Sequence, residues 1–595
     1  MGAQDIRLSI ISGPSEPALV KWTFNDLIAK QAKGMPASVA VVSQHQNIMM
    51  SYQELQQRSE QLAMGLIALG LTKGDSLAVM LGNRIEYVEI FFACSKVGAY
   101  VTLMNYAYSA HELTAALSST KSKLLLTTAK TSRYDYMSSL QAVEKKVPFL
   151  KRIIILDDIS HRDRDVVLPG SWLTYQALVD TAVAINIDWA SREIIECNDI
   201  LNLQFTSGST GAPKAAALTH FGMMNSARYL SIKMKVKKQD IIAIPVPLFH
   251  AFGLVMGLCV SMVAGTTAVF PSEYFEVDST LRSVEKYQCT GIYGVTTMFL
   301  DEMAHPDFKK ANRSTLRFGI MAGSSMPHSL LSRIINEFPV RELFTNWGMT
   351  ELSSVATMTT SQDPIVKKMK TAGRLLPHFI AKIINVETGM PVPWGVRGEV
   401  VVGGFGVMHS YYGDESRTSQ AIRIHEEDLL PGHAGRDENG DLRRWMHTGD
   451  EAYLDEDGYF VITGRIKDLI IRGGENISPL EIEARLFEHA SIQQAAVFGV
   501  PSDRYGEEVA TILELKDDEK RRPSDSEIRD WVRQTLARYK VPVHLWWLGD
   551  TSKGVPAIWP KTANGKLKKV EIRTIAEGIL KAQTKTAVPL IRSNM

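Results

Sequence analysis

The sequence predicts an α/β protein with a large N-terminal domain of helix-covered β-sheets and a small C-terminal α/β domain. The chain has 595 residues, which is too long for one ordinary hydrophobic core. Its first third alternates helical periods with continuous apolar runs, the pattern of a sheet that is covered on both faces. A compact stretch of the size of a small domain follows Arg465. We therefore expect domains at residues 1–465 and 466–595.

The alternation in the first third can be followed element by element. A helical face is predicted from the spacing of four leucines, Leu55, Leu62, Leu66 and Leu69. Glycines at 70 and 74 predict the turn that ends this helix. The segments after the turn are expected to be a strand at 76–81, a helix at 85–97, and strands at 100–103, at Leu124 and at Ile153.

The stretch from Ile241 to Ser272 contains no Asp, Glu, Lys or Arg. An uncharged stretch of this length raises the question of a membrane span. Prolines and glycines divide it into short pieces, at Pro245, Pro247, Gly253, Gly257 and Gly265. We therefore expect a buried strand and a buried helix here, and no membrane span.

Composition and charge exclude several classes of protein. Hydrophobic residues make up 45% and charged residues 22% of the chain, as in soluble globular proteins, and the formal net charge of +1 argues against a nucleic-acid partner. The four cysteines are scattered, which predicts reduced thiols rather than a disulfide framework or a zinc site. Neither a secretory signal nor a peroxisomal tripeptide is evident, so we expect an intracellular, cytoplasmic protein.

The residue pattern changes twice in the last third of the chain. Residues 400–458 consist of short strands, glycines and charged turns, and 425–441 are expected to form an exposed loop. In the small domain, Ser478 as N-cap, Pro479 at the first helical position and Glu481 at the third predict a helix start. The remaining predicted elements are strands at 495–500 and 509–515 and a helix over 524–538.

A loop between two extended segments is the first candidate site. It reads TSGSTGAPK from Thr206 to Lys214 and does not fit the common P-loop spacing. Backbone N–H groups of such a glycine-containing turn can form an anion-binding nest, with hydroxyls and Lys214 as additional donors. Taken alone, the loop is equally compatible with a surface hairpin.

Further segments carry oxygen ligands and charges. NWGMTE (346–351) places Glu351 after a hydroxyl, a pair suited to Mg²⁺ beside phosphates, although alone it would suit a helix cap. HTGD (447–450) places Asp450 at a turn, where it could hold a ribose diol or form only an Asx-turn. GRIKDLIIRGGENISP (464–479) and PKTANGK (560–566) are charged and punctuated by glycines.

In this order and at these separations, the segments resemble the acyl-adenylate-forming (AMP-binding) superfamily, which includes acyl-CoA synthetases, nonribosomal-peptide adenylation domains and firefly luciferase. The resemblance covers roughly Trp22 to Arg573. PLFHAFG, MAGSSMP and RGGENISP are most similar to medium-chain type acyl-CoA synthetases. The resemblance implies a β-barrel-like subdomain within the large domain and a mobile C-terminal lid.

It also implies a two-step reaction with ATP, Mg²⁺ and CoA. A carboxylate attacks the α-phosphorus of ATP and releases pyrophosphate, and the thiol of CoA then displaces AMP. Such a reaction depends on neutralising phosphate charge. The residues that the resemblance assigns to ATP or AMP are Thr206, Ser207, Gly208, Ser209, Thr210, Gly211, Lys214, Gly323, Ser324, Ser325, Asn346, Trp347, Gly348, Met349, Asp450 and Arg465.

Other roles also follow from the resemblance. Thr350 and Glu351 would act at the α-phosphate and the metal, and Lys566 would be the adenylation lysine, although a lysine in KLKK could be only a solvated charge. His250 would gate the acyl site. The predicted acyl pocket consists of Phe252, Gly253, Met256, Val295 and Thr296. The predicted hinge is Lys467, and the predicted CoA channel passes Gly473 and Gly474.

The expected partners are an apolar carboxylic acid and CoA. Amino-acid-activating relatives place an aspartate near the acyl site, where this chain has Phe249 and His250, so an ammonium would be buried unpaired. One alternative is an acyl-AMP ligase that loads the phosphopantetheine thiol of a carrier protein. Another is an inactive nucleotide-binding relative, and a luciferase-like oxidase is a remote third.

Overall fold

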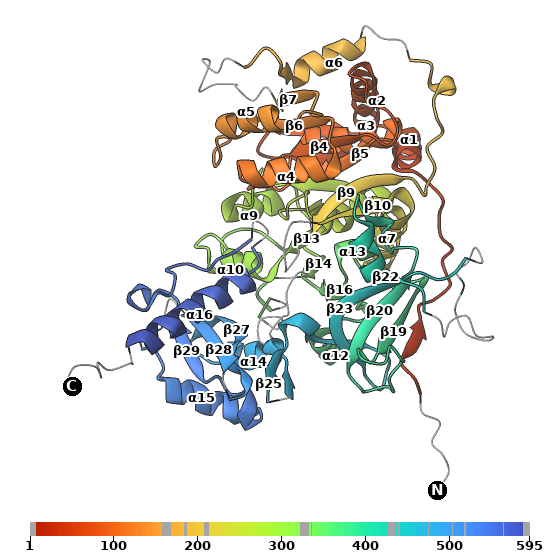
Figure 1. Ribbon diagram of the computed structural model, residues 1–595. Helices are drawn as coiled ribbons and strands as arrows, with labels where there is room; N and C mark the ends of the chain where they lie inside the picture. The colour runs from red at the N-terminus through yellow and green to blue at the C-terminus, as the bar shows by residue number, and fades with distance from the viewer. Residues whose placement is uncertain are drawn as a thin grey trace.

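The computed structural model describes residues 7–586 except 157–167, 184–186, 207–213, 322–332, 335, 339, 426–435, 437–440, 474, 503, 517–518, 520 and 563–564. Two largely parallel sheets, a larger and a small antiparallel sheet, and a separate C-terminal sheet organise these residues, with helices between and outside them. Figure 1 shows the C-terminal sheet and its helices as a distinct unit in blue.

The first sheet contains the alternating strands predicted in the first third of the chain. Strands β5, β4, β6, β7 and β8 run parallel, β9 runs parallel to β5, and β10 is antiparallel to β9. Its strands, in spatial order within the described residues, are β21 (Ser410–Tyr411), β10 (Lys214–Thr219), β9 (Ile200–Thr206), β5 (Tyr100–Leu103), β4 (Ser76–Met80), β6 (Leu124–Thr128), β7 (Arg152–Leu156) and β8 (Leu173–Thr174).

The second sheet is parallel apart from β3, which closes one edge as a hairpin with β2. Its described strands, in spatial order, are β15 (Glu342–Phe344), β14 (Phe318–Met321), β13 (Gly291–Gly294), β11 (Ile241–Ala243), β12 (Thr267–Phe270), β2 (Val39–Ser43) and β3 (Ile48–Ser51).

Helices pack between and outside these two sheets. They are needed on both faces because successive apolar side chains of a strand point to opposite faces of its sheet. On β4, Leu77 and Val79 face the main core, whereas Ala78 and Met80 face a second core under α4 (Ala110–Thr120) and α5 (Met137–Lys146). The main core also takes in α1 (Phe24–Gly34), α2 (Tyr52–Ala68), α3 (Ile85–Val97), α7 (His220–Lys233), the π-helix η2 (Phe252–Cys259) and α8 (Val260–Ala264).

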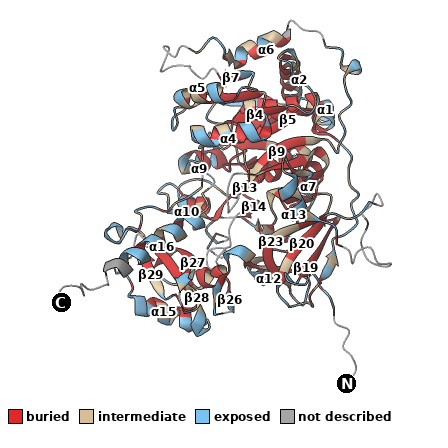
Figure 2. Cartoon of the chain, viewed as in Figure 1, coloured by how far each residue is buried: buried red, intermediate tan, exposed pale blue. Residues whose placement is uncertain are grey.

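The outer helices cover the remaining faces. Residues of α4 (Ala110–Thr120) and α5 (Met137–Lys146) pack on the first sheet, and residues of α9 (Val277–Lys286) and α10 (Thr296–Ala304) pack on the second. Helix α6 (Tyr175–Val183) packs on α2. Figure 2 shows the strands of the sheets as buried and the outer helices as partly exposed. The predicted covering of both sheet faces is confirmed.

The third sheet is antiparallel and corresponds to the β-barrel-like subdomain expected within the large N-terminal domain. Its described strands are β1 (Ile10–Ser12), β19 (Phe379–Ile384), β20 (Gly398–Gly404), β23 (Trp445–Leu454) and β22 (Ile422–Arg423), with β24 (Phe460–Arg465) beside β23. A small sheet of β16 (Asn346–Trp347), β17 (Thr357–Met358) and β18 (Arg374–Leu375), with α12 (Ile365–Lys370) and α13 (Glu415–Ala421), completes this region.

The C-terminal unit has its own sheet and its own cores. The strands are β26 (Glu475–Ile477), β25 (Ile470–Arg472), β28 (Gly506–Leu515), β27 (Ile492–Ser502) and β29 (His544–Trp547). Helices α14 (Pro479–Phe487) and α15 (Asp525–Arg533) cover one face, and α16 (Lys569–Thr586) covers the other. These residues form the small α/β unit that the sequence predicts.

Two details of this unit differ from the sequence prediction. Ser478 occupies the N-cap position of α14, but its hydroxyl donates to the carbonyl oxygen of Thr463 and makes no cap hydrogen bond. The predicted helix over 524–538 ends at Arg533, and a short 3₁₀ turn follows at Arg538–Lys540. Ser524 does cap α15 through a capping box with Glu527.

The uncharged stretch at 241–272 is not a single long helix. It folds as β11, η2, α8 and β12, all largely buried, which confirms the predicted buried strand and helix. Within the described residues, no helix is both long enough and apolar enough to cross a membrane. The loop expected at 425–441 falls mostly outside the described residues.

We predict that close packing of α2 on α6 makes Gly65 indispensable. A Cβ at Gly65 would lie 2.6 Å from the carbonyl oxygen of Leu178, and backbone cannot yield as a flexible side chain can. Gly65→Ala should therefore destabilise the protein by roughly 1–3 kcal/mol, as overpacking does, despite the better helix propensity of alanine.

Gly578→Ala is the matched control, because Gly578 lies in α16 with no atom within 4 Å of its added Cβ. This change should stabilise the protein by up to about 1 kcal/mol. Denaturant and thermal unfolding of both variants provide the measurement. A Gly65→Ala variant as stable as the Gly578→Ala variant would contradict the packing described for α2 and α6.

Candidate active site

Strands β9 and β10 bring the two ends of the candidate phosphate loop together. Thr206 and Lys214 are register partners at the end of this antiparallel pair where the loop connects the two strands. The three alanines after Lys214 are buried in β10, so the strand is held by the core. The structure thus places the loop on a hairpin stem, as predicted, although its residues Ser207, Gly208, Ser209, Thr210 and Gly211 lie outside the described residues.

Glu351 is buried on a short 3₁₀ helix, η3 (Thr350–Leu352), at the end of β16. The turn before it needs glycine, because a Cβ at Gly348 would lie 2.2 Å from the carbonyl oxygen of Ser354. The hydroxyl of Tyr411 donates to Oε1 of Glu351 over 2.8 Å. Glu351 therefore presents a carboxylate whose orientation is fixed by a neighbouring strand.

Asp450 is buried and shares its two carboxylate oxygens between two partners. The indole N–H of Trp347 donates to Oδ2 over 2.8 Å, and Nε of Arg465 lies 3.5 Å from Oδ1. Asp450 and Arg465 are also register partners on β23 and β24. Burial raises the pKa of the Asp450 carboxyl above its usual value, while Arg465 and Trp347 oppose the rise.

The turn before Asp450 is fastened to β20. Gly449 has a φ of 68°, a left-handed conformation that favours glycine, and its N–H donates to Oε1 of Glu399. The other oxygen of Glu399 lies 3.0 Å from Nδ1 of His447. One carboxylate thus holds two residues of the HTGD segment and sets the direction in which Asp450 leaves the strand.

Lys566 reaches the same place from the C-terminal unit. Its backbone is held by Thr562, whose N–H donates to the Lys566 carbonyl oxygen over 2.7 Å. Burial lowers the pKa of the Lys566 ammonium from 10.5 to about 8; Arg465 adds to the lowering and Asp450 opposes it. The predicted adenylation lysine therefore interacts electrostatically with the two residues assigned to the ribose.

The loop that carries Lys566 also packs on the start of α10. A Cβ at Gly565 would lie 2.9 Å from Oγ1 of Thr297 and 3.5 Å from Val295. Figure 1 shows α16, which follows this loop, beside α10. The C-terminal unit is therefore in contact with the predicted acyl segment in this structure.

His250 is half-buried at the start of η2 and carries no charge at neutral pH. Burial and the nearby Lys566 ammonium lower the pKa of its imidazole to about 3. Nδ1 accepts a hydrogen bond from the Phe252 N–H over 3.2 Å, which leaves the ring proton on Nε2. His250 can therefore act as a neutral hydrogen-bond donor close to Lys566.

The predicted acyl residues are all buried. Phe252, Gly253 and Met256 lie in η2, and Val295 and Thr296 lie at the start of α10. The ring of Phe252 stacks on Tyr293 with centroids 6.0 Å apart. The structure brings the two segments into one apolar core next to His250.

The other predicted residues are placed as follows. Asn346 lies on β16, and among the described residues its buried Nδ2 has no hydrogen-bond partner, so a donor in this region is left for a ligand. Met349 and Thr350 adjoin Glu351. Lys467 is exposed in a 3₁₀ turn and Gly473 in the turn between β25 and β26. The remaining positions, Gly323, Ser324, Ser325 and Gly474, lie outside the described residues.

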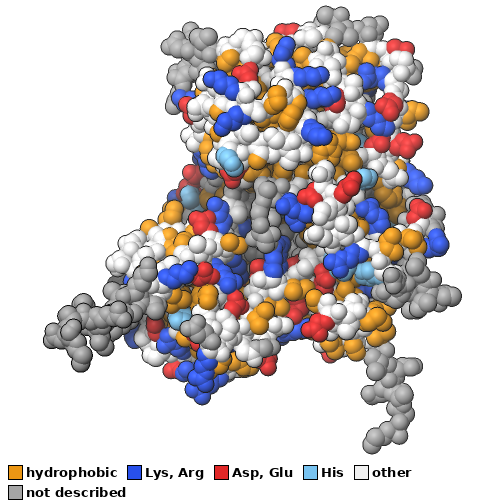
Figure 3. Space-filling model, in the orientation of Figure 1, with side chains coloured by type: hydrophobic (Ala, Val, Ile, Leu, Met, Phe, Trp, Pro, Cys, Tyr) orange, Lys and Arg blue, Asp and Glu red, His pale blue; other side chains and the backbone are white. Residues whose placement is uncertain are grey.

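Basic side chains surround this region. Figure 3 shows a hollow between the upper part of the molecule and the lower units, with Lys and Arg side chains gathered around it. Lys214, Arg465, Lys467 and Lys566 interact electrostatically with one another or with Asp450. The arrangement suits an anionic ligand such as a polyphosphate.

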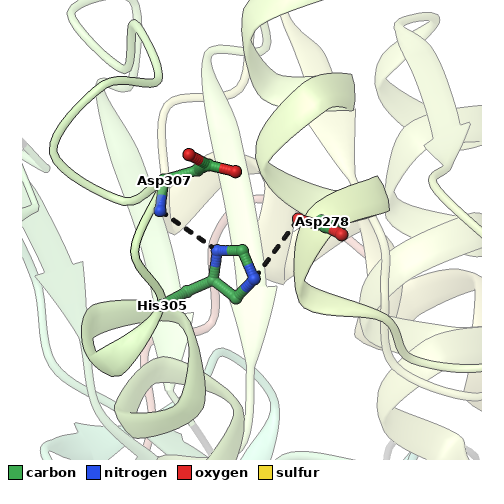
Figure 4. A group of neighbouring side chains, drawn as sticks. All are labelled: Asp278, His305 and Asp307. Carbon is green, nitrogen blue, oxygen red and sulfur yellow. Dashed lines mark hydrogen bonds and ion pairs between the residues drawn. The ribbon is translucent and has the colours of Figure 1, made fainter.

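A second group of ligand-type side chains lies at the ends of α9 and α10, where Figure 4 shows Asp278, His305 and Asp307. Nδ1 of His305 accepts from the Asp307 N–H, and Nε2 lies 3.3 Å from Oδ1 of Asp278. The Asp307 carboxylate pairs with Lys310 over 2.7 Å. These contacts fasten α10 to α9, and we assign no metal to them.

Two residues of the site were missed by sequence reasoning. Tyr411 and Glu399 contact Glu351 and the HTGD turn, yet each lies far from these residues in sequence. Their strands, β21 and β20, approach the site only through sheet pairing with β10 and β23. A single sequence carries no signal of such pairing.

The chain is similar to known enzymes along most of its length. Residues 28–412 match the family described as AMP-binding enzyme, and residues 481–566 match the AMP-binding enzyme C-terminal domain. The acyl-CoA ligase sidI of Beauveria bassiana is 36% identical over 98% of this chain and 96% of its own length. The bovine (Bos taurus) medium-chain acyl-CoA ligase ACSF2, mitochondrial, is 33% identical over 95% and 89%.

Among solved structures, the anthranilate CoA ligase AuaEII in complex with anthranoyl-AMP superposes with a TM-score of 0.80. The identity is 21%, over 96% of this chain and 99% of that chain. At this identity the match supports the fold alone. The predicted family resemblance and the predicted fold class are confirmed.

We predict that Lys566 titrates near pH 8, because burial and Arg465 destabilise its ammonium. Competitive acetylation across neutral and alkaline pH, read by mass spectrometry of the peptide that contains Lys566, gives its midpoint. Arg465→Gln should raise that midpoint and Asp450→Asn should lower it further. A midpoint near 10.5 in the unchanged protein, or no shift in either variant, would contradict the described placement of Lys566.

Proposed function

Because the chain belongs to the AMP-binding enzyme family and is an AMP-forming acyl-CoA ligase, we propose that it activates an apolar, fatty-type carboxylic acid as its acyl-adenylate and transfers the acyl group to CoA. The observation that supports this proposal is the electrostatic interaction of Lys566, in the C-terminal unit, with Asp450 and Arg465 of the large domain. A lysine beside a ribose-type carboxylate is the arrangement that an adenylation step requires.

In the proposed first step, an oxygen of the acid attacks the α-phosphorus of ATP and the bond to pyrophosphate breaks. No side chain needs to form a covalent bond; the enzyme neutralises charge and aligns the two reactants. Lys214 would hold the leaving pyrophosphate, and Lys566 would bridge the acid and the α-phosphate. Asp450 would accept hydrogen bonds from the ribose hydroxyls, with Arg465 beside it.

The residues fit a hard divalent cation. Glu351 is a buried carboxylate beside the Thr350 hydroxyl, and Mg²⁺ prefers such oxygen ligands together with substrate phosphates. We propose that Glu351 would hold Mg²⁺, which would supply positive charge to neutralise the phosphates of bound ATP.

The second step needs access for a thiol. The contact of Gly565 with α10 and the electrostatic interaction of Lys566 with Asp450 support assigning the described arrangement to adenylation. We propose that the chain then turns at Lys467 and brings the turn containing Gly473 and Gly474 to the site, where glycine backbone lets the pantetheine arm of CoA pass. Because the proposed rotation occurs at Lys467, we propose the domain boundary at 465/466.

The proposed substrate class is an apolar acid. Phe252, Met256 and Val295 are buried side by side in one core, and neutral His250 offers a hydrogen-bond donor without a charge. The segment at 249–250 offers no carboxylate to pair with an amino acid's ammonium, and burying that cation unpaired would be costly.

The acceptor and the location are also proposals. CoA is the proposed acceptor, and a carrier-protein phosphopantetheine is the alternative. Formation of an acyl thioester with free CoA as the sole thiol would favour CoA as the acceptor.

We propose a cytoplasmic location. The bovine relative is named as mitochondrial.

The function is tested by exchange of labelled pyrophosphate into ATP. We predict exchange that depends on a medium-length fatty acid and falls by about 10²–10³-fold in Lys566→Ala, since a positioned charge contributes on that scale. Lys568→Ala is the control, because Lys568 is exposed two residues away. Lys214→Ala should slow exchange more than it slows thioester formation from preformed acyl-adenylate. No exchange with any carboxylic acid would overturn the proposal.

A further inference from the structure

Tyr411 lies between two residues to which the proposed function gives separate tasks. Its hydroxyl donates to Oε1 of Glu351 over 2.8 Å. Its ring lies under the ammonium of Lys214, with Nζ 4.9 Å from the ring centroid. One buried side chain therefore contacts the proposed metal-binding carboxylate and the proposed pyrophosphate-binding lysine at the same time.

The backbone around Tyr411 is fixed on several sides. β21 pairs with β10, so that Tyr411 lies opposite Ala216, two residues from Lys214 on the same strand. The N–H of Met408 donates to the Glu351 carbonyl oxygen over 2.8 Å, and the N–H of Tyr411 donates to Oγ1 of Thr418 over 3.0 Å. The segment 408–412 thus fastens β10 to the short helix that carries Glu351.

The chemistry of the phenol suits both contacts. A tyrosine hydroxyl keeps its proton at neutral pH and donates a hydrogen bond to the Glu351 carboxylate. The ring face carries negative electrostatic potential and attracts the Lys214 ammonium. A phenylalanine would keep the second contact and lose the first.

We propose that Tyr411 is a positioning residue that orients Glu351 toward the divalent cation and Lys214 toward the pyrophosphate end of the nucleotide. The inference rests on the proposed function, because it takes the ligands of Glu351 and Lys214 from it. Tyr411 itself need not touch the nucleotide. It acts by holding a carboxylate and an ammonium in fixed orientations, as outer-shell partners of metal ligands do.

Binding measurements test this inference without catalysis. Mn²⁺ affinity is measured by electron paramagnetic resonance in the presence of α,β-methylene-ATP, in which a CH₂ group replaces the oxygen at the bond that would break. Affinity for pyrophosphate without metal is measured by calorimetry. In Tyr411→Phe, Mn²⁺ should bind about 10–100-fold more weakly, the usual cost of losing an outer-shell partner. Pyrophosphate affinity should stay unchanged, because the ring under Lys214 remains.

Tyr411→Leu removes the ring as well. It should weaken Mn²⁺ binding as much as Tyr411→Phe does, and pyrophosphate binding in addition by about 2–5-fold, the range of an accessible cation–π contact. Tyr412→Phe is the matched control, because that neighbouring ring packs on Tyr100 with centroids 5.9 Å apart and should leave both affinities unchanged.

The outcomes are separable from those of the proposed function. A Tyr411→Phe variant with unchanged Mn²⁺ affinity, or with a loss of pyrophosphate affinity as large as that of Tyr411→Leu, would overturn the positioning role. Loss of both affinities in Tyr412→Phe would do the same, by showing a general effect of the strand. Absence of carboxylate-dependent exchange in the unchanged protein would instead overturn the acyl-activating function, whatever the binding data show.

Discussion

The carboxylate of Asp450 is the point on which the rest of the candidate site depends. It is buried, and a buried carboxylate is costly unless charged and hydrogen-bonded partners compensate it. Trp347 supplies a hydrogen bond from the small sheet, Arg465 supplies a charge from β24, and Lys566 adds a second charge from the C-terminal unit. Three separate parts of the chain therefore interact with the Asp450 carboxylate.

This constraint connects the fold to the proposed chemistry. β23 places Asp450 opposite Arg465, and the Glu399 carboxylate fixes the glycine turn before it. Because Lys566 is drawn to the same charge, the position of the C-terminal unit and the formation of the site are linked. The contact between Ser478 and Thr463 joins the two units near the proposed hinge and is consistent with that linkage.

Much of the fold could be predicted from local patterns. Helix α3 and strand β5 begin and end at the predicted residues, because their apolar periods are long and their turns carry glycine. The hairpin stem around the phosphate loop was likewise foreseen from LNLQFT and KAAALTH. The Ser478 cap was misjudged because a tertiary acceptor, the Thr463 carbonyl, competes with the helix for the same hydroxyl.

The candidate site was predictable only as a set of segments. Glu351, Asp450 and Lys566 were identified through motifs, and they come from η3, β23 and the loop before α16. The partners that orient them, Tyr411 and Glu399, could not be found, because strand pairing between distant segments leaves no local pattern. Trp347 was predicted only as a nucleotide-binding residue, and the hydrogen bond from its indole N–H to Asp450 could not be predicted from the sequence.

The most direct test of this account compares ATP with 2′,3′-dideoxy-ATP in carboxylate-dependent pyrophosphate exchange, in the unchanged protein and in Asp450→Asn. Loss of the diol removes hydrogen bonds to a charged group, so the unchanged protein should prefer ATP by about 10–100-fold. In Asp450→Asn, which keeps the shape of the side chain and removes its charge, the two nucleotides should react at nearly equal rates. A variant that retains the full preference for ATP would contradict the central role assigned to Asp450.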